Sequence, residues 1–170
     1  MDAAGRHARR AKTSAHVEIA AAQTGDLETI LDLWGELAAF HAGLDPAFAP
    51  APTWRLAYAG YLSTLLGRPD ARILVARERG RVVAFGIARI TLLPPFFADR
   101  RRGFIQDVFT RRGYRRRGIA RRLVTGLLEW LRQEAVETVE LTVAANNVPA
   151  TRLWQRLGFR PYMDHYKRGL

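Results

Sequence analysis

The stretch FIQDVFTRRGYRRRGIARRL, which runs from Phe104 to Leu123, joins a strand to a helix through an arginine-rich loop. Its first part, 104–110, alternates as a β-strand does, and Gly118 precedes a helix that begins at Ile119. The start of a helix has free backbone N–H groups and a partial positive charge, so it binds anions. Nearby arginines repel that positive charge, and a bound anion would offset the repulsion. They are Arg115, Arg116, Arg117, Arg121 and Arg122. The stretch therefore predicts a phosphate-binding loop.

The net charge of +11 is concentrated in two short segments. Segment 100–122 contains many arginines and a single acid, Asp107, and segment 1–16 is also basic. Residues 1–15 lack hydrophobic periodicity, which predicts a disordered basic arm. We expect 16–170 to form one domain, because a chain of 170 residues is long enough for a single hydrophobic core.

The composition excludes several classes of protein. There is no cysteine, so disulfides, thiol catalysis and cysteine-ligated metal are excluded. The four histidines show no metal-ligand spacing, and we expect no metal site. No apolar run reaches the roughly 18 residues of a membrane span, and no apolar segment follows the basic start as in a signal peptide. We therefore expect a cytoplasmic protein that does not enter a membrane.

Hydrophobic periodicity predicts the order β-α-α-β-β-β-α-β-α-β, which is an α/β (α+β) fold with a mixed central sheet flanked by helices. The helices start or end at capping residues, glycines or prolines. The expected strands are 16–22, 73–78, 82–91, 104–110, 139–144 and 162–168. The expected helices are one that begins at Leu27 and ends near His41, then 54–66, 119–134 and 149–157.

Two sequence patterns resemble those of the GCN5-related N-acetyltransferase (GNAT) superfamily, across roughly residues 17–168. The family's phosphate-loop pattern, Gln/Arg-x-x-Gly-x-Gly/Ala, is matched by Arg115 to Ala120. The second pattern, Asn-x-x-Ala-x-x-x-Tyr-x-x-x-Gly-Phe, is matched from Asn147 to Phe159, except that Trp154 replaces the tyrosine. Both patterns fall in the right order and on the right predicted elements.

The resemblance implies an N-acetyltransferase that moves an acetyl group from acetyl-CoA to a primary amine by direct attack on the thioester. It implies that the loop amides hold the pyrophosphate of coenzyme A, and that the pantetheine arm lies between the strand before the loop and strand 139–143. Asn147 and the helix after it would border the acetyl end. The implied cofactor-binding residues are Val108, Phe109, Thr110, Arg115, Arg116, Arg117, Gly118, Ile119, Ala120, Arg121, Asn147 and Trp154.

Asp107 is the predicted catalytic residue, because similar enzymes often place a base or a substrate-binding carboxylate on this strand. The other interpretation is that Asp107 neutralises the neighbouring arginines. Glu140 on the next strand is a second candidate, with a solvent-facing role as its alternative. Trp154 cannot act as an acid at neutral pH. Water, Tyr162 or Tyr166 would then protonate the leaving thiolate.

Two other functions remain open from the sequence. The basic arm and the arginine cluster are typical of a nucleic-acid-binding module, although no interleaved aromatic pattern accompanies them. An acyl-CoA-binding sensor without catalysis is the other, and Gln106 and Trp154 are the residues that favour it. The acceptor could be a small amine, an antibiotic, a peptide N-terminus or a lysine side chain. The sequence is also compatible with a homodimer.

Overall fold

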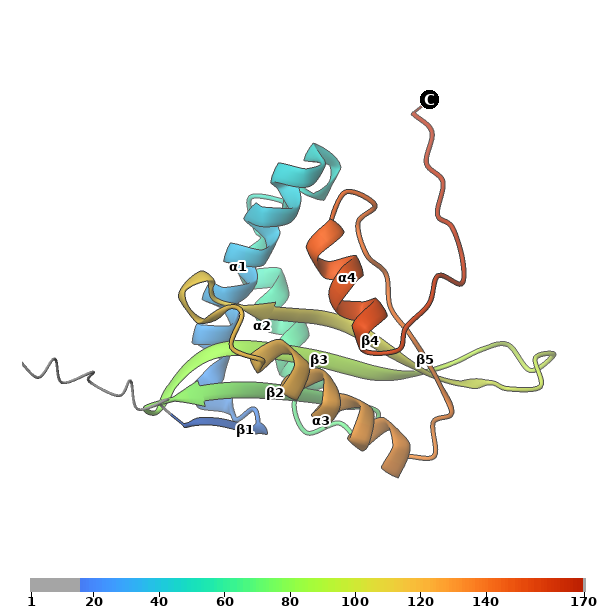
Figure 1. Ribbon diagram of the computed structural model, residues 1–170, viewed down its shortest axis with the longest axis horizontal. Helices are drawn as coiled ribbons and strands as arrows, with labels where there is room; N and C mark the ends of the chain where they lie inside the picture. Colours follow the sequence, from blue (N-terminus) through green and yellow to red (C-terminus); the bar gives the residue numbers. More distant parts are fainter. Residues whose placement is uncertain (1–15, 170) are drawn as a thin grey trace, which may run out of the picture.

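Five strands form the central sheet of the computed structural model, which describes residues 16–169 (Figure 1). They lie side by side in the order of the sequence, the first four as antiparallel neighbours and the last parallel to the fourth. The strands are β1 (Val17–Ala21), β2 (Ala71–Glu78), β3 (Arg81–Leu92), β4 (Arg101–Thr110) and β5 (Thr138–Glu140).

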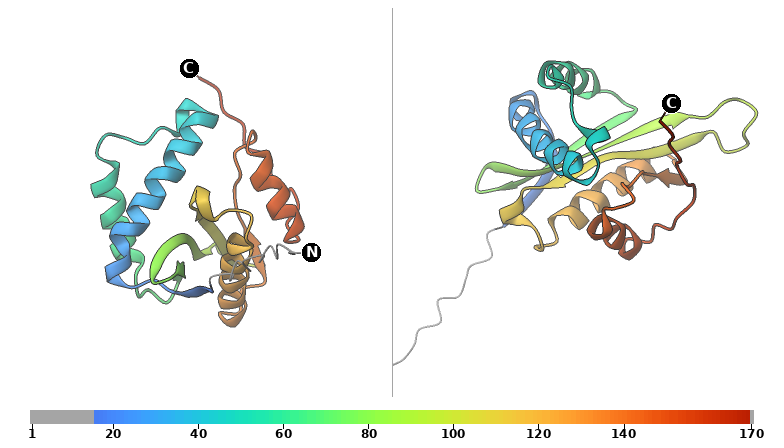
Figure 2. Two further views of the ribbon diagram at one scale, coloured as in Figure 1. Left: turned by 60° about the vertical axis from the view of Figure 1, so that its left-hand side comes forward. Right: turned by 90° about the horizontal axis from the view of Figure 1, so that it is seen from above.

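Helices cover both faces of the sheet, as the view from above shows (Figure 2). One face carries α1 (Leu27–Leu44) and α2 (Trp54–Leu65), and the other carries α3 (Ile119–Gln133) and α4 (Val148–Arg156). Three short 3-10 turns, η1 (Thr24–Asp26), η2 (Pro46–Phe48) and η3 (Arg112–Tyr114), lie in the connections. The expected α/β fold class is therefore confirmed, with a mixed sheet between two helical layers.

The sheet separates two hydrophobic cores, because successive side chains of a strand point to opposite faces. The core beneath α1 and α2 contains Phe85 and Ile87 of β3, both fully buried. The core beneath α3 is centred on Leu123, Leu127 and Leu131, which recur at every fourth position along one side of the helix. This apolar stripe holds α3 against the sheet.

Strands β4 and β5 part shortly after they meet. Their register covers only three pairs, Arg102 with Thr138, Gly103 with Val139 and Phe104 with Glu140. Beyond Phe104, β4 continues to Thr110 without a strand partner on that side, while the chain after β5 turns toward α4 (Figure 1). The last part of β4 therefore borders a divergence in the sheet.

A bulge interrupts β4 in its pairing with β3. Ile87 lies opposite Asp107 and Ala88 lies opposite Ile105, so Gln106 has no partner in the register. An extra residue of this kind re-aims the side chains around it. Here Gln106 and Asp107 both reach α2, although they are adjacent in the strand.

The C-terminal part of the chain differs from the sequence prediction. The expected strand 162–168 is absent, and this segment extends from the body without regular structure (Figure 1). Tyr162 and Tyr166 in this segment are exposed. The expected strand 139–144 stops at Glu140. Both errors have one cause: alternating residues form a strand only where a neighbouring backbone offers hydrogen bonds, and the chain after β5 leaves β4.

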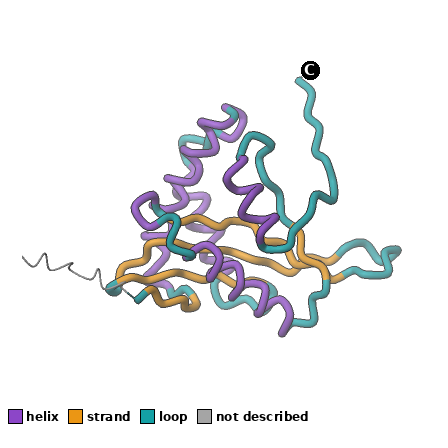
Figure 3. Tube along the Cα trace, in the orientation of Figure 1, coloured by secondary structure: helices purple, strands orange, loops and turns teal. Residues whose placement is uncertain are grey.

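The connection between β3 and β4 forms a hairpin that projects beyond the helices (Figure 3). Pairing extends to Leu92 and Arg101, so β4 begins earlier than the expected Phe104. The expected basic arm, 1–15, lies outside the described residues. No helix of the described part is long and apolar enough to cross a bilayer.

Candidate functional site

The loop between β4 and α3 has a backbone suited to anion binding. Gly118 adopts a left-handed conformation, with φ of 74°, immediately before the helical residue Ile119. A left-handed residue followed by a right-handed one turns successive N–H groups into a shared concavity, which is a common anion site. A Cβ added at Gly118 would meet no atom within 4 Å, so the space in front of this backbone is open. Arg116 is also left-handed, with φ of 61°.

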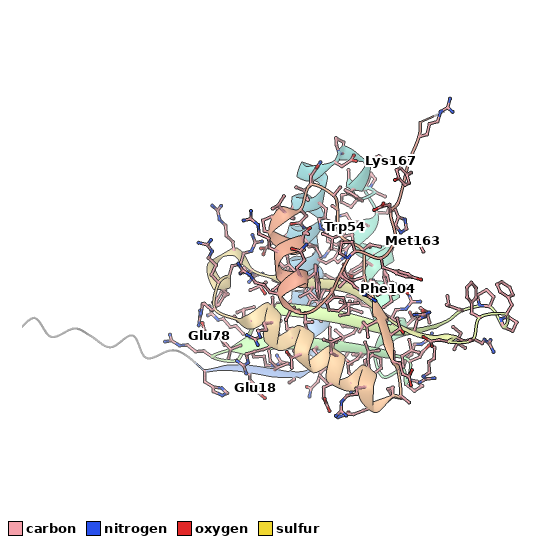
Figure 4. All side chains as sticks on the ribbon, turned by 45° about the vertical axis from the view of Figure 1, so that its right-hand side comes forward. Glu18, Trp54, Glu78, Phe104, Met163 and Lys167 are labelled. Atoms are coloured by element: carbon pink, nitrogen blue, oxygen red, sulfur yellow. The ribbon has the colours of Figure 1, made fainter. Side chains whose placement is uncertain are left out.

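Two of the loop arginines are engaged by the protein itself. Arg115 donates from Nε to the Thr110 carbonyl oxygen at 2.9 Å, and its guanidinium lies 5.3 Å from the ring centre of Phe109. Arg117 is paired with Glu78, which lies at the end of β2 (Figure 4). These arginines hold the loop against the sheet.

Other side chains around the loop have polar groups without a protein partner. Within the described residues, Arg116, Arg121 and Arg122 make no ion pair. Arg121 and Arg122 line a surface groove of about 740 Å³ between β1 and α3, which includes neither Gly118 nor Asp107. The buried hydroxyl of Thr110, at the end of β4, has no hydrogen-bond partner. Ile119 is buried and Ala120 half-buried, so their side chains serve packing.

Asp107 is half-buried on the face of the sheet covered by α1 and α2. Its Oδ2 accepts from the Tyr58 hydroxyl at 2.9 Å and from Gln106 Nε2 at 3.1 Å. Burial raises the pKa of Asp107, while these hydrogen bonds and the nearby His41 and Trp34 favour the ionised form and only partly offset it. The result is a carboxyl group that accepts a proton more readily than an exposed aspartate.

The aromatic side chains of α2 complete the surroundings of Asp107. Tyr58 stacks on Trp34 of α1, with ring centres 4.3 Å apart, and Trp54 lies 4.9 Å from Trp34. Burial and the adjacent Asp107 raise the pKa of Tyr58, which therefore remains a hydrogen-bond donor. Sequence analysis did not identify the hydroxyl of Tyr58 as a partner of Asp107. The signal was the spacing of Trp54, Tyr58 and Tyr61 along one side of α2.

The remaining predicted residues have structural contacts. The Asn147 side chain accepts from the Ala150 N–H at 3.2 Å and so caps α4. Trp154 packs edge-on against Phe159, at 5.3 Å between ring centres. Glu140 lies 3.7 Å from Arg102, an ion pair that accounts for this carboxylate. No cluster of potential metal ligands occurs in the described residues.

A family model for the acetyltransferase (GNAT) family matches residues 34–159 of this chain. The chain belongs to this family. GNAT enzymes use acetyl-CoA as co-substrate, and the match includes β4, the Gly118 loop and α4. Among curated protein sequences, none matches significantly.

Solved structures share the GNAT fold over most of the chain. A transcriptional regulator from Bacillus halodurans C-125 is 20% identical over 91% of this chain and 100% of its own, with a TM-score of 0.74. A predicted acetyltransferase with acetyl-CoA from Clostridium acetobutylicum is 15% identical over 91% and 96%, with a TM-score of 0.73. An aminoglycoside 6'-N-acetyltransferase from Acinetobacter haemolyticus is 18% identical over 90% and 99%, with a TM-score of 0.70. At such identities these likenesses support the fold alone.

Proposed function

We propose that this protein transfers the acetyl group of acetyl-CoA to a primary amine, with Asp107 as the residue that accepts the amine's proton. The observation that carries the proposal is the position of Asp107. It is a half-buried carboxyl group on β4, in the part of the strand that has separated from β5, and the same strand leads into the Gly118 loop.

The residues along this path fit coenzyme A. The open space in front of Gly118, together with the N–H groups of Ile119 and Ala120, suits a pyrophosphate. Arg116 and Arg121 add positive charge, whereas Arg115 and Arg117 support the loop from behind. The unpaired edge of β4 from Val108 to Thr110 offers main-chain groups to the pantetheine amides.

The thioester supplies the carbonyl carbon that the amine attacks. A neutral amine nitrogen forms the new N–C bond, the C–S bond breaks, and the nitrogen gives up one proton to the Asp107 carboxylate, directly or through water. The departing thiolate takes one proton from solvent, because Trp154 is held against Phe159 and its indole is no acid. The hydrogen bonds from Tyr58 and Gln106 both go to Oδ2 of Asp107 and hold the carboxyl group in place.

The acceptor class within the amines is the open part of this proposal. The aminoglycoside acetyltransferase of similar fold makes a polyamine antibiotic one candidate. A carboxylate beside the aromatic rings of Trp34 and Tyr58 also suits a cationic amine, since both features favour a positive charge.

The first test is calorimetric titration of acetyl-CoA into the full chain at moderate salt, with inorganic pyrophosphate as the charge control. We expect saturable binding much tighter than that of pyrophosphate, followed by turnover with at least one member of an amine panel that includes an aminoglycoside, a polyamine and lysine peptides. Binding no tighter than that of pyrophosphate would overturn the cofactor assignment. Tight binding without turnover on any amine would favour the acyl-CoA sensor.

A further inference from the structure

A line of four polar side chains connects β3 to Asp107 across the face beneath α2. Arg89 Nη1 donates to the Tyr61 hydroxyl oxygen at 2.8 Å, and the Tyr61 hydroxyl donates to Gln106 Oε1. Gln106 Nε2 in turn donates to Asp107 Oδ2 at 3.1 Å. All four side chains are half-buried.

Every hydrogen bond in this line has a fixed direction. The guanidinium of Arg89 has only donors, so the Tyr61 oxygen accepts from it and the Tyr61 O–H is directed onward. The amide of Gln106 then presents its oxygen to Tyr61 and its NH₂ group to Asp107. A flipped amide would place oxygen against a carboxylate, which is repulsive. The arginine at one end and the carboxylate at the other therefore favour the same orientation of the Gln106 amide.

We propose that Arg89 and Tyr61 are positioning residues for Asp107, which hold Gln106 so that its amide N–H supports the ionised carboxylate. The inference rests on the proposed function only for the use of this carboxylate as a base, because the hydrogen-bond line itself is a property of the structure. It gives a role to Gln106, which cannot act as a base itself and whose presence favoured a sensor without catalysis in the sequence analysis.

The line orients Asp107 and does not conduct protons. An amide such as that of Gln106 neither gains nor loses a proton at neutral pH, so the path from Asp107 to Tyr61 is closed to proton transfer. The positive end remains solvated, since Arg89 and Tyr61 both line a cavity of about 110 Å³ together with Arg68 and Asp70. Asp70 pairs with Arg68 at 2.6 Å, and the charge of Arg89 in the same cavity also helps to hold the pKa of Asp70 below its usual range.

The effect on Asp107 has a definite sign. The groups that face it are Tyr58 of α2, His41 and Trp34 of α1 and Gln106 of its own strand. Donors favour the ionised form, so removal of the Gln106 support raises the pKa of Asp107 further above the value that burial already produces. A higher pKa leaves less carboxylate available at a given pH.

The test follows the side-chain carboxyl carbon of Asp107 by ¹³C NMR in the full chain, with Asp107→Asn assigning the signal. Tyr61→Phe and Arg89→Met should each raise the titration midpoint by about half a pH unit or more, and Tyr58→Phe, which removes a direct donor, gives the scale. Arg89→Lys retains a cationic donor and should restore much of the shift. The acid limb of kcat/KM should move in the same direction.

Two matched variants serve as controls. Arg132→Met removes an exposed arginine of α3, on the opposite face of the sheet, and Ser63→Ala removes a hydroxyl of α2 that bonds only to its own helix. Both should leave the Asp107 midpoint unchanged. An unchanged midpoint in folded Tyr61→Phe, which differs by one oxygen, would overturn the inference whether or not Asp107 is the base. Full turnover by Asp107→Asn would instead overturn the base assignment, and the midpoint shifts would still decide the positioning role.

Discussion

At the scale of single residues, the position of Asp107 is unfavourable for its charge and useful for taking up a proton. Burial disfavours its charge, and Tyr58 and Gln106 restore part of the lost solvation through two hydrogen bonds. A carboxyl group in this state costs stability, but it takes up a proton closer to neutral pH than an exposed aspartate does. Loss of the carboxylate is therefore expected to lower activity and to raise stability.

Replacing the carboxyl group tests the catalytic side. Asp107→Asn should lower kcat by roughly 10²- to 10⁴-fold, the usual contribution of a general base, with acetyl-CoA affinity retained. In the unchanged enzyme, kcat/KM should fall as the pH drops through the raised pKa of Asp107, because protonation removes the base. Steady-state kinetics across pH, with calorimetry for binding, measure both. A pH profile that keeps this acid limb in Asp107→Asn would assign the limb to another group.

The same substitution tests the stability side. A folded-state pKa above the unfolded one means that the folded protein binds the proton more tightly, so stability falls as pH rises through that window and stays lower above it. Asp107→Asn should therefore raise the melting temperature at pH 7.5 and raise it less, or not at all, at acidic pH. Thermal unfolding at several pH values measures this, with the exposed Asp164→Asn as the control. An equal shift at all pH values would argue against a buried charge.

At the scale of elements, the Gly118 loop depends on one backbone conformation. A side chain in the left-handed region costs about 1–2 kcal/mol, and the new Cβ of Gly118→Ala would also occupy the space proposed for the pyrophosphate. We expect a modest loss of thermal stability and a loss of acetyl-CoA affinity of about tenfold or more. Gly113→Ala, in the same loop with open space and no left-handed requirement, is the matched control. Undiminished affinity in Gly118→Ala would remove the loop from the cofactor site.

The contact between β4 and α3 depends on a different glycine. A Cβ at Gly103 would lie 2.8 Å from Leu131 Cδ1, and Leu131 is fully buried, so Gly103→Ala should cost about 1–3 kcal/mol of folding free energy. Gly60 lies at an exposed position in the middle of α2 with open space around it. Gly60→Ala should stabilise the fold by about 0.5–1 kcal/mol. Urea denaturation measures the free energy of unfolding of both variants, which should fall in Gly103→Ala and rise in Gly60→Ala. A neutral Gly103→Ala would mean that Leu131 moves aside without cost.

At the scale of the whole molecule, part of the basic excess serves the fold. In the described part, several arginines serve the fold, as the pairs of Arg117 with Glu78 and Arg111 with Glu36 show. Arginines that are paired in this way are not free to bind the phosphates of a nucleic-acid backbone. The nucleic-acid hypothesis therefore applies to the arm, 1–15, and to the arginines without an ion pair within the described residues, Arg116, Arg121 and Arg122.

Deleting residues 1–15 should separate the two activities. We expect gel-shift binding of the full chain to DNA or RNA to be weak and to fall steeply as salt rises, and the shortened chain to lose it while retaining acetyl transfer. Retained binding without the arm would place a nucleic-acid surface on the folded part. Loss of acetyl transfer on deletion would connect the arm to the catalytic site.

The features that could be predicted from the sequence are those set by neighbours in the chain. The order of elements up to α4, the start of α3 at Ile119 and the glycine before it follow from local periodicity and from helix-end chemistry, which a short window of residues contains. The choice of Asp107 as the candidate base came from the resemblance to similar enzymes and from its place on a predicted strand, and it stays a prediction. Both phosphate-loop and Asn147 patterns are local as well, which is why the family could be named from them.

The environment of Asp107 was decided only by the tertiary structure. Tyr58 is 49 positions away and meets Asp107 because α2 packs on the sheet, and the bulge at Gln106 depends on the register with β3. No local pattern encodes a cross-sheet register, and the same holds for the missing strand 162–168, which had the alternation but found no neighbouring backbone. Local sequence thus determined which segments can become strands, helices and an anion loop. Long-range packing decided which side chains meet, because burial and hydrogen-bond partners exist only once distant segments are brought together.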